Sequence, residues 1–213
     1  EIYNLEKKSK SLNKKIFIAY NRRFYNSVIK LNNIIKDDGG VKSCNFDFTE
    51  WSHVIEDLKM KKNVKQKWFL ANSSHVVDLV FFIIGQPKKM NSFTSGSLKW
   101  HDSASRYVGA GISNKNILFS YHANWSGPGR WSIEFITNNY KLILRPIEKL
   151  KIIKIGSIDQ IEIDLDNKDD INFKPGLFKQ VNAFINNDFN NLCSIKEQIS
   201  NIHFYNKISN YNS

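Results

Sequence analysis

Hydrophobic and polar residues alternate along much of the chain, and this alternation predicts a β-sheet. The period-two pattern is clear between Cys44 and Phe48. Comparable β-type runs lie at residues 88–98, 106–112, 116–125, 131–137, 140–145, 150–156 and 159–165. The turns at 113–116, 127–129 and 138–139 are rich in Asn, Gly or Ser and are too short for parallel crossovers. We therefore expect one large, open, mainly antiparallel sheet.

Apolar residues recur at helical spacing in the segments around these strands. The spacing predicts helices over residues 24–37, 72–84 and 176–187, and another from Ser194 onward. The pair Gly39-Gly40 and the residue Gly85 are expected to end the first two, and Ser194 with Glu197 has the spacing of a capping box. We expect the helices at 24–37 and 72–84 to cover a single face of the sheet, which gives an α+β fold.

The first twenty residues show a different pattern. A helical repeat over residues 2–12 leads into the apolar run from Ile16 to Tyr20. A helix followed by a buried strand is typical of a parallel α/β unit, so we expect the tail of such a unit before the antiparallel sheet. The first residue is Glu1 and not Met, and no signal-peptide pattern follows it. The chain is therefore expected to begin within a longer protein.

Composition and charge exclude several classes of function. The formal net charge is +11, but only five of the 31 basic residues are arginines, and the lysines are scattered among Asn and Ile in every segment. This distribution does not favour specific nucleic-acid binding. The longest apolar run, from Val76 to Ile84 and interrupted by Asp78, is much shorter than the roughly 20 residues of a membrane span. We therefore expect a soluble protein without a membrane partner.

Cysteine and histidine spacing predicts neither a metal nor a disulfide. Cys44 and Cys193 are far apart in sequence and match no metal or redox motif, which favours a reduced, cytoplasmic protein. The histidines at positions 53, 101, 122 and 203 show no ligand spacing either. No metal site is predicted.

Two motifs resemble those of a known enzyme family. They are Ala19-Tyr20-Asn21-Arg22-Arg23-Phe24-Tyr25, and Ser73-Ser74-His75-Val76-Val77-Asp78-Leu79 with Gly85-Gln86-Pro87 after it. Their order and separation are similar to those of the glucose-fructose oxidoreductase and inositol dehydrogenase (Gfo/Idh/MocA) family. Weaker similarities lie at residues 127–131 and 174–176, so the resemblance covers nearly the whole chain.

The resemblance implies a division of the chain and a function. Residues 1–20 would be the last helix and strand of a Rossmann-type dinucleotide-binding domain, and residues 21–213 the C-terminal domain that binds substrate and forms oligomers. The parent protein would be an NAD- or NADP-dependent oxidoreductase acting on a secondary alcohol of a sugar, sugar nucleotide or cyclitol. The family commonly associates through the uncovered sheet face, so a homodimer or homotetramer is expected, with a face rich in Ile, Phe and Tyr.

Two family motifs have no counterpart in this sequence. A Gly-x-Gly-x-x-Gly turn, which sets a pyrophosphate against a helix N-terminus, is absent, and so is the family's Glu-Lys-Pro motif. Both are expected before Glu1. We therefore expect this chain alone to bind no NAD(P) and to be inactive.

The resemblance makes His75 the proposed catalytic residue. If Asn72 or Ser73 caps the helix, His75 lies in its first turn, where the helix dipole keeps the imidazole neutral and able to accept a proton. Asp78, on the same helical face, is expected to orient the ring. The alternative is that Asp78 complements the dipole and His75 is an ordinary polar residue. Many family members have an acid four residues before the histidine, where this chain has Ala71, so Asn72 is assigned to capping or substrate contact.

Four further residues are candidates for substrate binding. Arg22 and Arg23 follow the expected strand directly and either face a ligand or pair with a carboxylate. Trp125 and Arg130 flank the glycine-rich turn and offer an aromatic face for a sugar and a guanidinium for a carboxylate or phosphate. The alternative for this turn is a hairpin with core tryptophans.

A second function from another class stays open. A chain without a cofactor domain could be a binding module that holds a carbohydrate or an anion without chemistry. The coding sequence before Glu1 distinguishes the two hypotheses, because the first requires a glycine-rich strand-turn-helix there.

Overall fold

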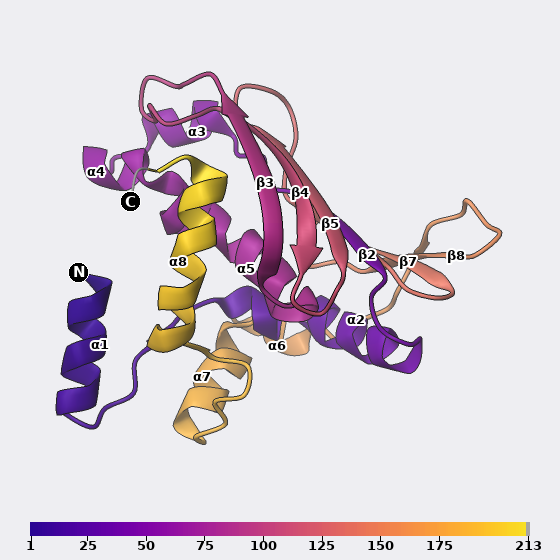
Figure 1. The fold of residues 1–213 in the computed structure, drawn as a ribbon. Helices are drawn as coiled ribbons and strands as arrows, with labels where there is room; N and C mark the ends of the chain where they lie inside the picture. The colour runs from indigo at the N-terminus through magenta and orange to yellow at the C-terminus, as the bar shows by residue number, and fades with distance from the viewer. Residues whose placement is uncertain (212–213) are drawn as a thin grey trace.

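A computed structural model describes residues 1–211 and shows one large sheet with helices against it (Figure 1). The sheet has eight strands in the order β3-β4-β5-β2-β6-β7-β8-β9. Their bounds are β2 Ser43–Asp47, β3 Pro87–Ser95, β4 Arg106–Ser113, β5 Leu118–Asn124, β6 Ser132–Ile136, β7 Tyr140–Leu144, β8 Lys151–Lys154 and β9 Ile161–Glu162. Every strand of this sheet overlaps a run that the alternating pattern predicted, and the predicted α+β class is confirmed.

One strand pair is parallel. Strand β2 lies between β5 and β6, parallel to β5 and antiparallel to β6, while the other neighbours in the sheet are antiparallel. The turns at 113–116 and 138–139 do join antiparallel neighbours, as expected. The parallel pair is possible because the connection from β2 to β3 is long and contains several helices, so β2 can be inserted between strands that come later in the chain.

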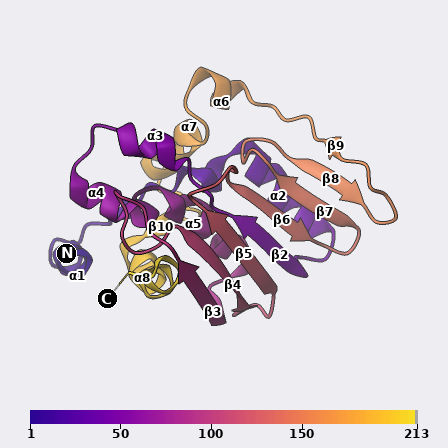
Figure 2. The same cartoon turned by 90° about the horizontal axis from the view of Figure 1, so that it is seen from above.

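Three helices pack on one face of the sheet (Figure 2). They are α2 (Asn26–Asp37), α5 (Ser74–Ile84) and α8 (Ile195–Ser209). Phe81 of α5 meets Phe46 and Phe119 of the sheet edge-on, with ring centres 6.0 and 5.1 Å apart. The single-face arrangement of the helices at 24–37 and 72–84 is therefore confirmed. The predicted capping box is also present, because the Ser194 side chain accepts a hydrogen bond from the Glu197 amide.

The N-terminal segment differs from the expected buried strand. Helix α1 (Ile2–Ser11) contacts α8, and β1 contains only Phe17–Ile18, which are half-buried. Strand β1 pairs antiparallel with β10 (Cys193–Ser194), so no parallel unit forms within residues 1–211. A parallel strand needs a partner strand running in the same direction, and β10 runs the opposite way.

Several short helices were not predicted. They are η1 (Asn21–Phe24), α3 (Ser52–Asp57), α4 (Lys62–Gln66), the π-helical turn η2 (Phe69–Ser73) and α6 (Lys168–Asn172). Each has at most six residues, which is too short for a periodic signal. Helix α7 (Leu177–Ile185) forms where expected, but its apolar side chains are largely exposed, including Phe184 at 53% and Ile185 at 68%.

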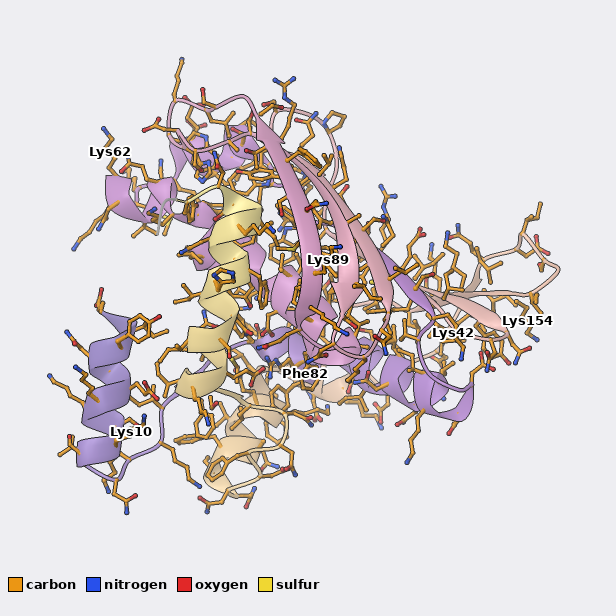
Figure 3. All side chains as sticks on the ribbon, viewed as in Figure 1. Lys10, Lys42, Lys62, Phe82, Lys89 and Lys154 are labelled. Carbon is orange, nitrogen blue, oxygen red and sulfur yellow. The ribbon has the colours of Figure 1, made fainter. Side chains whose placement is uncertain are left out.

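Positive charge is spread over the molecule. Lys10, Lys62, Lys89 and Lys154 lie on α1, α4, β3 and β8, and Lys42 lies in the loop before β2 (Figure 3). Cys44 and Cys193 are both free and buried. Within the described part of the chain, no helix combines the length and the apolar character that crossing a bilayer requires.

Candidate functional site

The structure places His75 at the start of α5, where η2 runs directly into that helix. The prediction that Asn72 or Ser73 caps the helix is wrong. Ser73 has helical backbone angles, with φ −64° and ψ −25°, and makes no side-chain capping bond. The helical backbone begins before this point because η2 precedes α5, so the dipole of a free helix end does not act on His75.

The His75 ring is kept neutral by its surroundings instead. It packs edge-on against the ring of Tyr20, with centres 5.1 Å apart, and its Nδ1 is buried without a hydrogen-bond partner among the described residues. Burial and, second, the charge of Arg22 lower the pKa of His75 to about 3. The ring is therefore neutral at neutral pH, and its buried Nδ1 has no hydrogen-bond partner within residues 1–211.

Asp78 does not orient His75, contrary to the prediction. Its carboxylate accepts two hydrogen bonds from Arg23, at 2.8 and 2.6 Å, and both side chains are almost fully buried. Burial raises the pKa of Asp78 to about 6 although the Arg23 bonds lower it. Burial by itself lowers the pKa of Arg23, but the bonds and charge of Asp78 reverse that and raise it. Of the two alternatives for Arg23, the structure shows the ion pair.

A second carboxylate, that of Glu197, joins the buried Arg23–Asp78 pair. Arg23 also donates to Glu197 of α8, at 2.6 Å, so the network joins η1, α5 and α8. Donor atoms of Asp78, Glu197 and Cys193 lie within 4.8 Å of one another, a spacing that suits a metal ion. Arg23 already bonds to both carboxylates. Its guanidinium therefore supplies the positive charge that a metal ion would otherwise provide at this position.

A separate polar cluster forms around Glu50, which follows β2. Its side chain is 1% exposed and accepts hydrogen bonds from Asn72 Nδ2 at 2.9 Å, Ser73 Oγ at 2.7 Å and Arg130 Nη1 at 2.9 Å. Burial raises the pKa of Glu50, and these donors oppose that shift. Asn72, a predicted substrate contact, therefore serves as a donor that ties the start of the α5 region to Glu50.

Two arginines converge on the indole of Trp131. The guanidinium of Arg22 lies 4.9 Å from the ring centre and that of Arg130 lies 4.8 Å from it. Arg130 also lies 5.0 Å from the ring of Trp51, which is 47% exposed. The structure thus brings Arg22, His75 and Arg130 into one region, because the Arg22 charge acts on the His75 ring and the charges of Arg130 and Glu50 act on Arg22.

Trp125 is a core residue. It is 1% exposed, stacks on Trp100 and donates its indole N–H to the carbonyl of Phe48. Its selection as a sugar-binding surface is therefore wrong. Of the alternative, a hairpin with core tryptophans, only the core tryptophans are found, because β2 lies between β5 and β6 and the 127–129 turn does not join neighbouring strands.

Sequence reasoning missed Tyr20, Glu50 and Trp51. A signal for Glu50 was present, because the alternation of buried residues at Cys44, Phe46 and Phe48 continues to position 50 and places that carboxylate on the covered face. Tyr20 and Trp51 had no such signal, since their neighbours come from distant segments.

The buried neutral histidine predicts a pH-dependent stability. The pKa of His75 is about 3 in the folded chain, against 6.5 for an unperturbed histidine, so between these values the unfolded chain binds the extra proton. The His75 contribution is therefore present above about pH 6.5 and is lost as the pH falls, at up to about 1.4 kcal/mol per pH unit. Urea unfolding of the wild type and His75→Gln from about pH 7.5 to pH 5.5 should show a shallower fall for the variant. Parallel profiles would refute the buried neutral ring.

Comparisons with known proteins show the fold. No family model and no curated protein matches the sequence. Among solved structures, UDP-N-acetylglucosamine 3-dehydrogenase GnnA from Acidithiobacillus ferrooxidans is similar over 98% of this chain and 65% of its own, with TM-score 0.70 and 11% identity. An NAD-binding oxidoreductase from Klebsiella pneumoniae is similar over 76% and 50%, with TM-score 0.60 and 11% identity.

A protein of another kind shares the fold. The super-repressor mutant of Gal80p from Saccharomyces cerevisiae is similar over 78% of this chain and 50% of its own, with TM-score 0.60 and 13% identity. This chain thus spans between half and two thirds of the length of these three structures. At 11% to 13% sequence identity the structural similarity establishes the architecture alone. The function must be argued from the site.

Proposed function

We propose that this chain is the substrate-binding and oligomerising part of an NAD(P)-dependent oxidoreductase of the glucose-fructose oxidoreductase and inositol dehydrogenase family. Its substrate would be a secondary alcohol of a sugar, sugar nucleotide or cyclitol. In this proposal residues 1–20 belong to the dinucleotide-binding domain and residues 21–213 to the substrate domain. The observation behind it is His75, a neutral ring near the charge of Arg22, whose guanidinium shares the Trp131 indole with that of Arg130.

His75 would take the proton of the reacting alcohol. Oxidation of a secondary alcohol to a ketone removes a hydride from carbon and a proton from oxygen, so a neutral base beside the hydroxyl lowers the barrier. The unprotonated nitrogen accepts that proton, and the reverse reaction returns it. Arg22, Asn72 and Arg130 would bind and orient the substrate around this point, while the Arg23–Asp78 pair holds η1 against α5.

The residues of this chain do not fit the nicotinamide cofactor. The sequence contains no Gly-x-Gly-x-x-Gly turn, and within residues 1–211 neither sheet has the parallel strand–turn–helix arrangement that binds a pyrophosphate. The proposal therefore assigns NAD(P), the hydride acceptor, to a domain outside this chain. GnnA, whose name gives a sugar nucleotide as its substrate, supports the assignment at the level of the fold.

A non-catalytic role is the second candidate. The similarity to the super-repressor mutant of Gal80p favours it, because that name gives a repressor. In that case the chain would hold a carbohydrate or an anion by means of Arg22 and Arg130 without transferring a hydride.

One experiment separates the two candidates. The chain is expressed together with the coding sequence that precedes Glu1, and NAD(P) reduction is measured with a panel of sugars, sugar nucleotides and cyclitols. The proposal expects a glycine-rich nucleotide motif in the added sequence, turnover of at least one substrate, and no NAD(P) binding by the 213-residue chain in calorimetry. A chain that starts at or near Glu1, or an extended protein without turnover, would favour the binding module.

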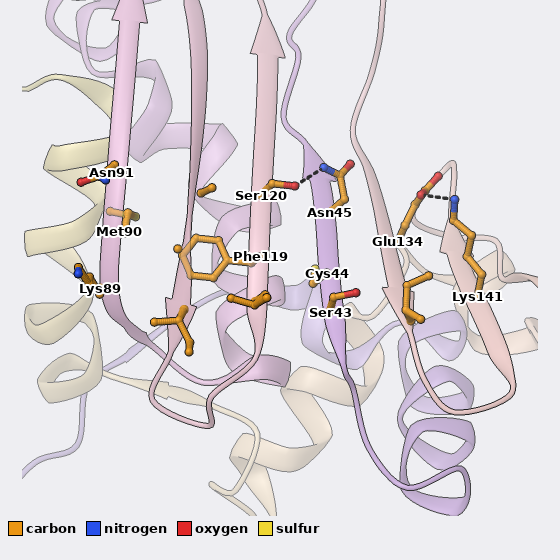
Figure 4. A pocket seen from close by; sticks show the side chains of 15 residues that line it. Ser43, Cys44, Asn45, Lys89, Met90, Asn91, Phe119, Ser120, Glu134 and Lys141 are labelled. Atoms are coloured by element: carbon orange, nitrogen blue, oxygen red, sulfur yellow. Dashed lines mark hydrogen bonds and ion pairs between the residues drawn. The ribbon is translucent and has the colours of Figure 1, made fainter.

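The uncovered face of the sheet supports the proposal of a homo-oligomer. A groove of about 780 Å³ lies there, lined by side chains that include Asn45, Leu118, Ser120 and Lys141 (Figure 4). Leu118 is 61% exposed and Phe93 of β3 is 67% exposed. The expected tyrosines are not on this face, because Tyr107 and Tyr121 point into the core. A second copy of the chain is the proposed occupant, since the face carries Glu134 beside Lys141 and can match its own charges about a two-fold axis.

Sedimentation velocity tests this interface. At micromolar concentration the wild-type chain should be a dimer or tetramer, and Phe93→Asp should shift it to the monomer because a charge would be buried in the contact. Phe173→Asp, at another exposed phenylalanine outside the sheet, is the matched control and should leave the state unchanged. A wild-type monomer, or the same effect from both substitutions, would refute the interface.

A further inference from the structure

The two arginines beside Trp131 differ in how their charges are balanced. Arg130 bonds to the buried carboxylate of Glu50 at 2.9 Å. Arg22 donates only to the side-chain amide oxygen of its neighbour Asn21, at 3.0 Å, and has no carboxylate within ion-pair distance in residues 1–211. The two guanidiniums therefore have one bonded carboxylate between them.

Arg22 is half-buried in this state. Burial lowers its pKa, and the carboxylates whose charges oppose this shift, on Glu148 and Glu50, do not bond to it. A desolvated guanidinium is costly unless an anion bonds to it, as Asp78 does for the neighbouring Arg23. The Trp131 indole lies 4.9 Å from the Arg22 guanidinium, and the N–H groups that donate to an anion lie in the guanidinium plane.

We infer that Arg22 binds an anionic group of the substrate, either a phosphate ester or a carboxylate attached to the sugar. This inference rests on the proposed function for the sugar itself, while the anion follows from the unpaired guanidinium. Both groups present two coplanar oxygens that a guanidinium bonds in a bidentate manner. Arg130, which bonds to Glu50 and lies over the same indole, adds positive potential at Arg22.

The charge of Arg22 also connects substrate binding to the proposed base, His75. The positive charge of Arg22 lowers the pKa of His75, and an anion bonded to Arg22 would offset that charge. His75 would then be a stronger proton acceptor when an anionic sugar is bound than when the site is empty. A neutral sugar would lack this effect.

The test is an NMR titration of the 213-residue chain that follows the Trp131 indole N–H signal. The probes are glucose 1-phosphate, glucuronate and uncharged glucose, each at millimolar concentrations and constant ionic strength. At least one charged probe should bind at least about tenfold more tightly than glucose, and the better of the two identifies the anion. Arg22→Gln should weaken that probe by about tenfold to hundredfold, and Arg22→Lys should restore part of the affinity.

Arg145→Gln is the matched control, because it removes the same charge at an exposed position. It should bind the charged probe as the wild type does. Equal binding of glucose, no effect of Arg22→Gln, an equal loss in Arg145→Gln, or no saturable binding of either anion would each overturn the inference. Turnover of a neutral sugar that survives Arg22→Gln would overturn it and leave the proposed function intact. Arg22-dependent anion binding in a protein that does not turn over NAD(P) would support the anion site and would overturn the proposed oxidoreductase function.

Discussion

Replacing Asp78 with asparagine should lower the free energy of unfolding of this chain by about 3 to 5 kcal/mol. The substitution keeps the shape of the side chain but removes the charge that two bonds from Arg23 now meet, at 2.8 and 2.6 Å. Both side chains are almost completely buried, at 1% and 2% exposure, so water cannot replace the lost partner. Glu197 would remain beside Arg23, but its side chain is 35% exposed and compensates only in part.

Urea unfolding followed by circular dichroism measures this effect at pH 7. Glu162→Gln is the matched control, because Glu162 forms an exposed ion pair with Lys149 and its loss should produce no measurable change. The double variant Arg23→Met with Asp78→Leu should be more stable than Asp78→Asn alone, since the charge it leaves without a partner, on Glu197, is 35% exposed to water. If Asp78→Asn costs no more than the control, the network does not stabilise the junction of η1 and α5.

Replacing His75 with alanine should lower kcat by about 10² to 10⁴ in the complete oxidoreductase, if the proposed function is correct. This decrease in kcat is the one expected when a positioned general base is removed. The affinity for NAD(P) should be unchanged, because His75 contacts the substrate in this proposal and not the nucleotide. The measurement is steady-state kinetics, with circular dichroism to verify that the variant is folded.

His203→Ala provides the control for this prediction. His203 is exposed on α8, so its removal should leave kcat at the wild-type value. An unchanged kcat in His75→Ala would show that His75 is an ordinary polar residue and that the role implied by the family resemblance does not transfer to this chain. Because His75 is partly buried against Tyr20, His75→Asn is a second variant that tests the base if alanine unfolds the protein.

The periodicity of the sequence located the long elements. Alternation between polar and apolar residues marks strands because successive side chains point to opposite faces, and this signal placed β3 to β7 within a few residues of their bounds. The same local rules placed α5 and the capping box of α8. They could not place the π-helical turn before α5, since the contact of Ser73 with Glu50 that accompanies it comes from a segment about twenty residues away.

For the site, the sequence by itself determined which residues have suitable chemistry: His75, Asp78, the adjacent arginines and Arg130. Only the tertiary structure decided their partners. Arg22 and Arg23 are neighbours with the same side chain, yet one bonds to Asp78 in the interior and the other lies on Trp131 without a carboxylate. The physical reason is that pairing and desolvation depend on residues brought together from distant parts of the chain, and these set the state of each charge more strongly than the local sequence does.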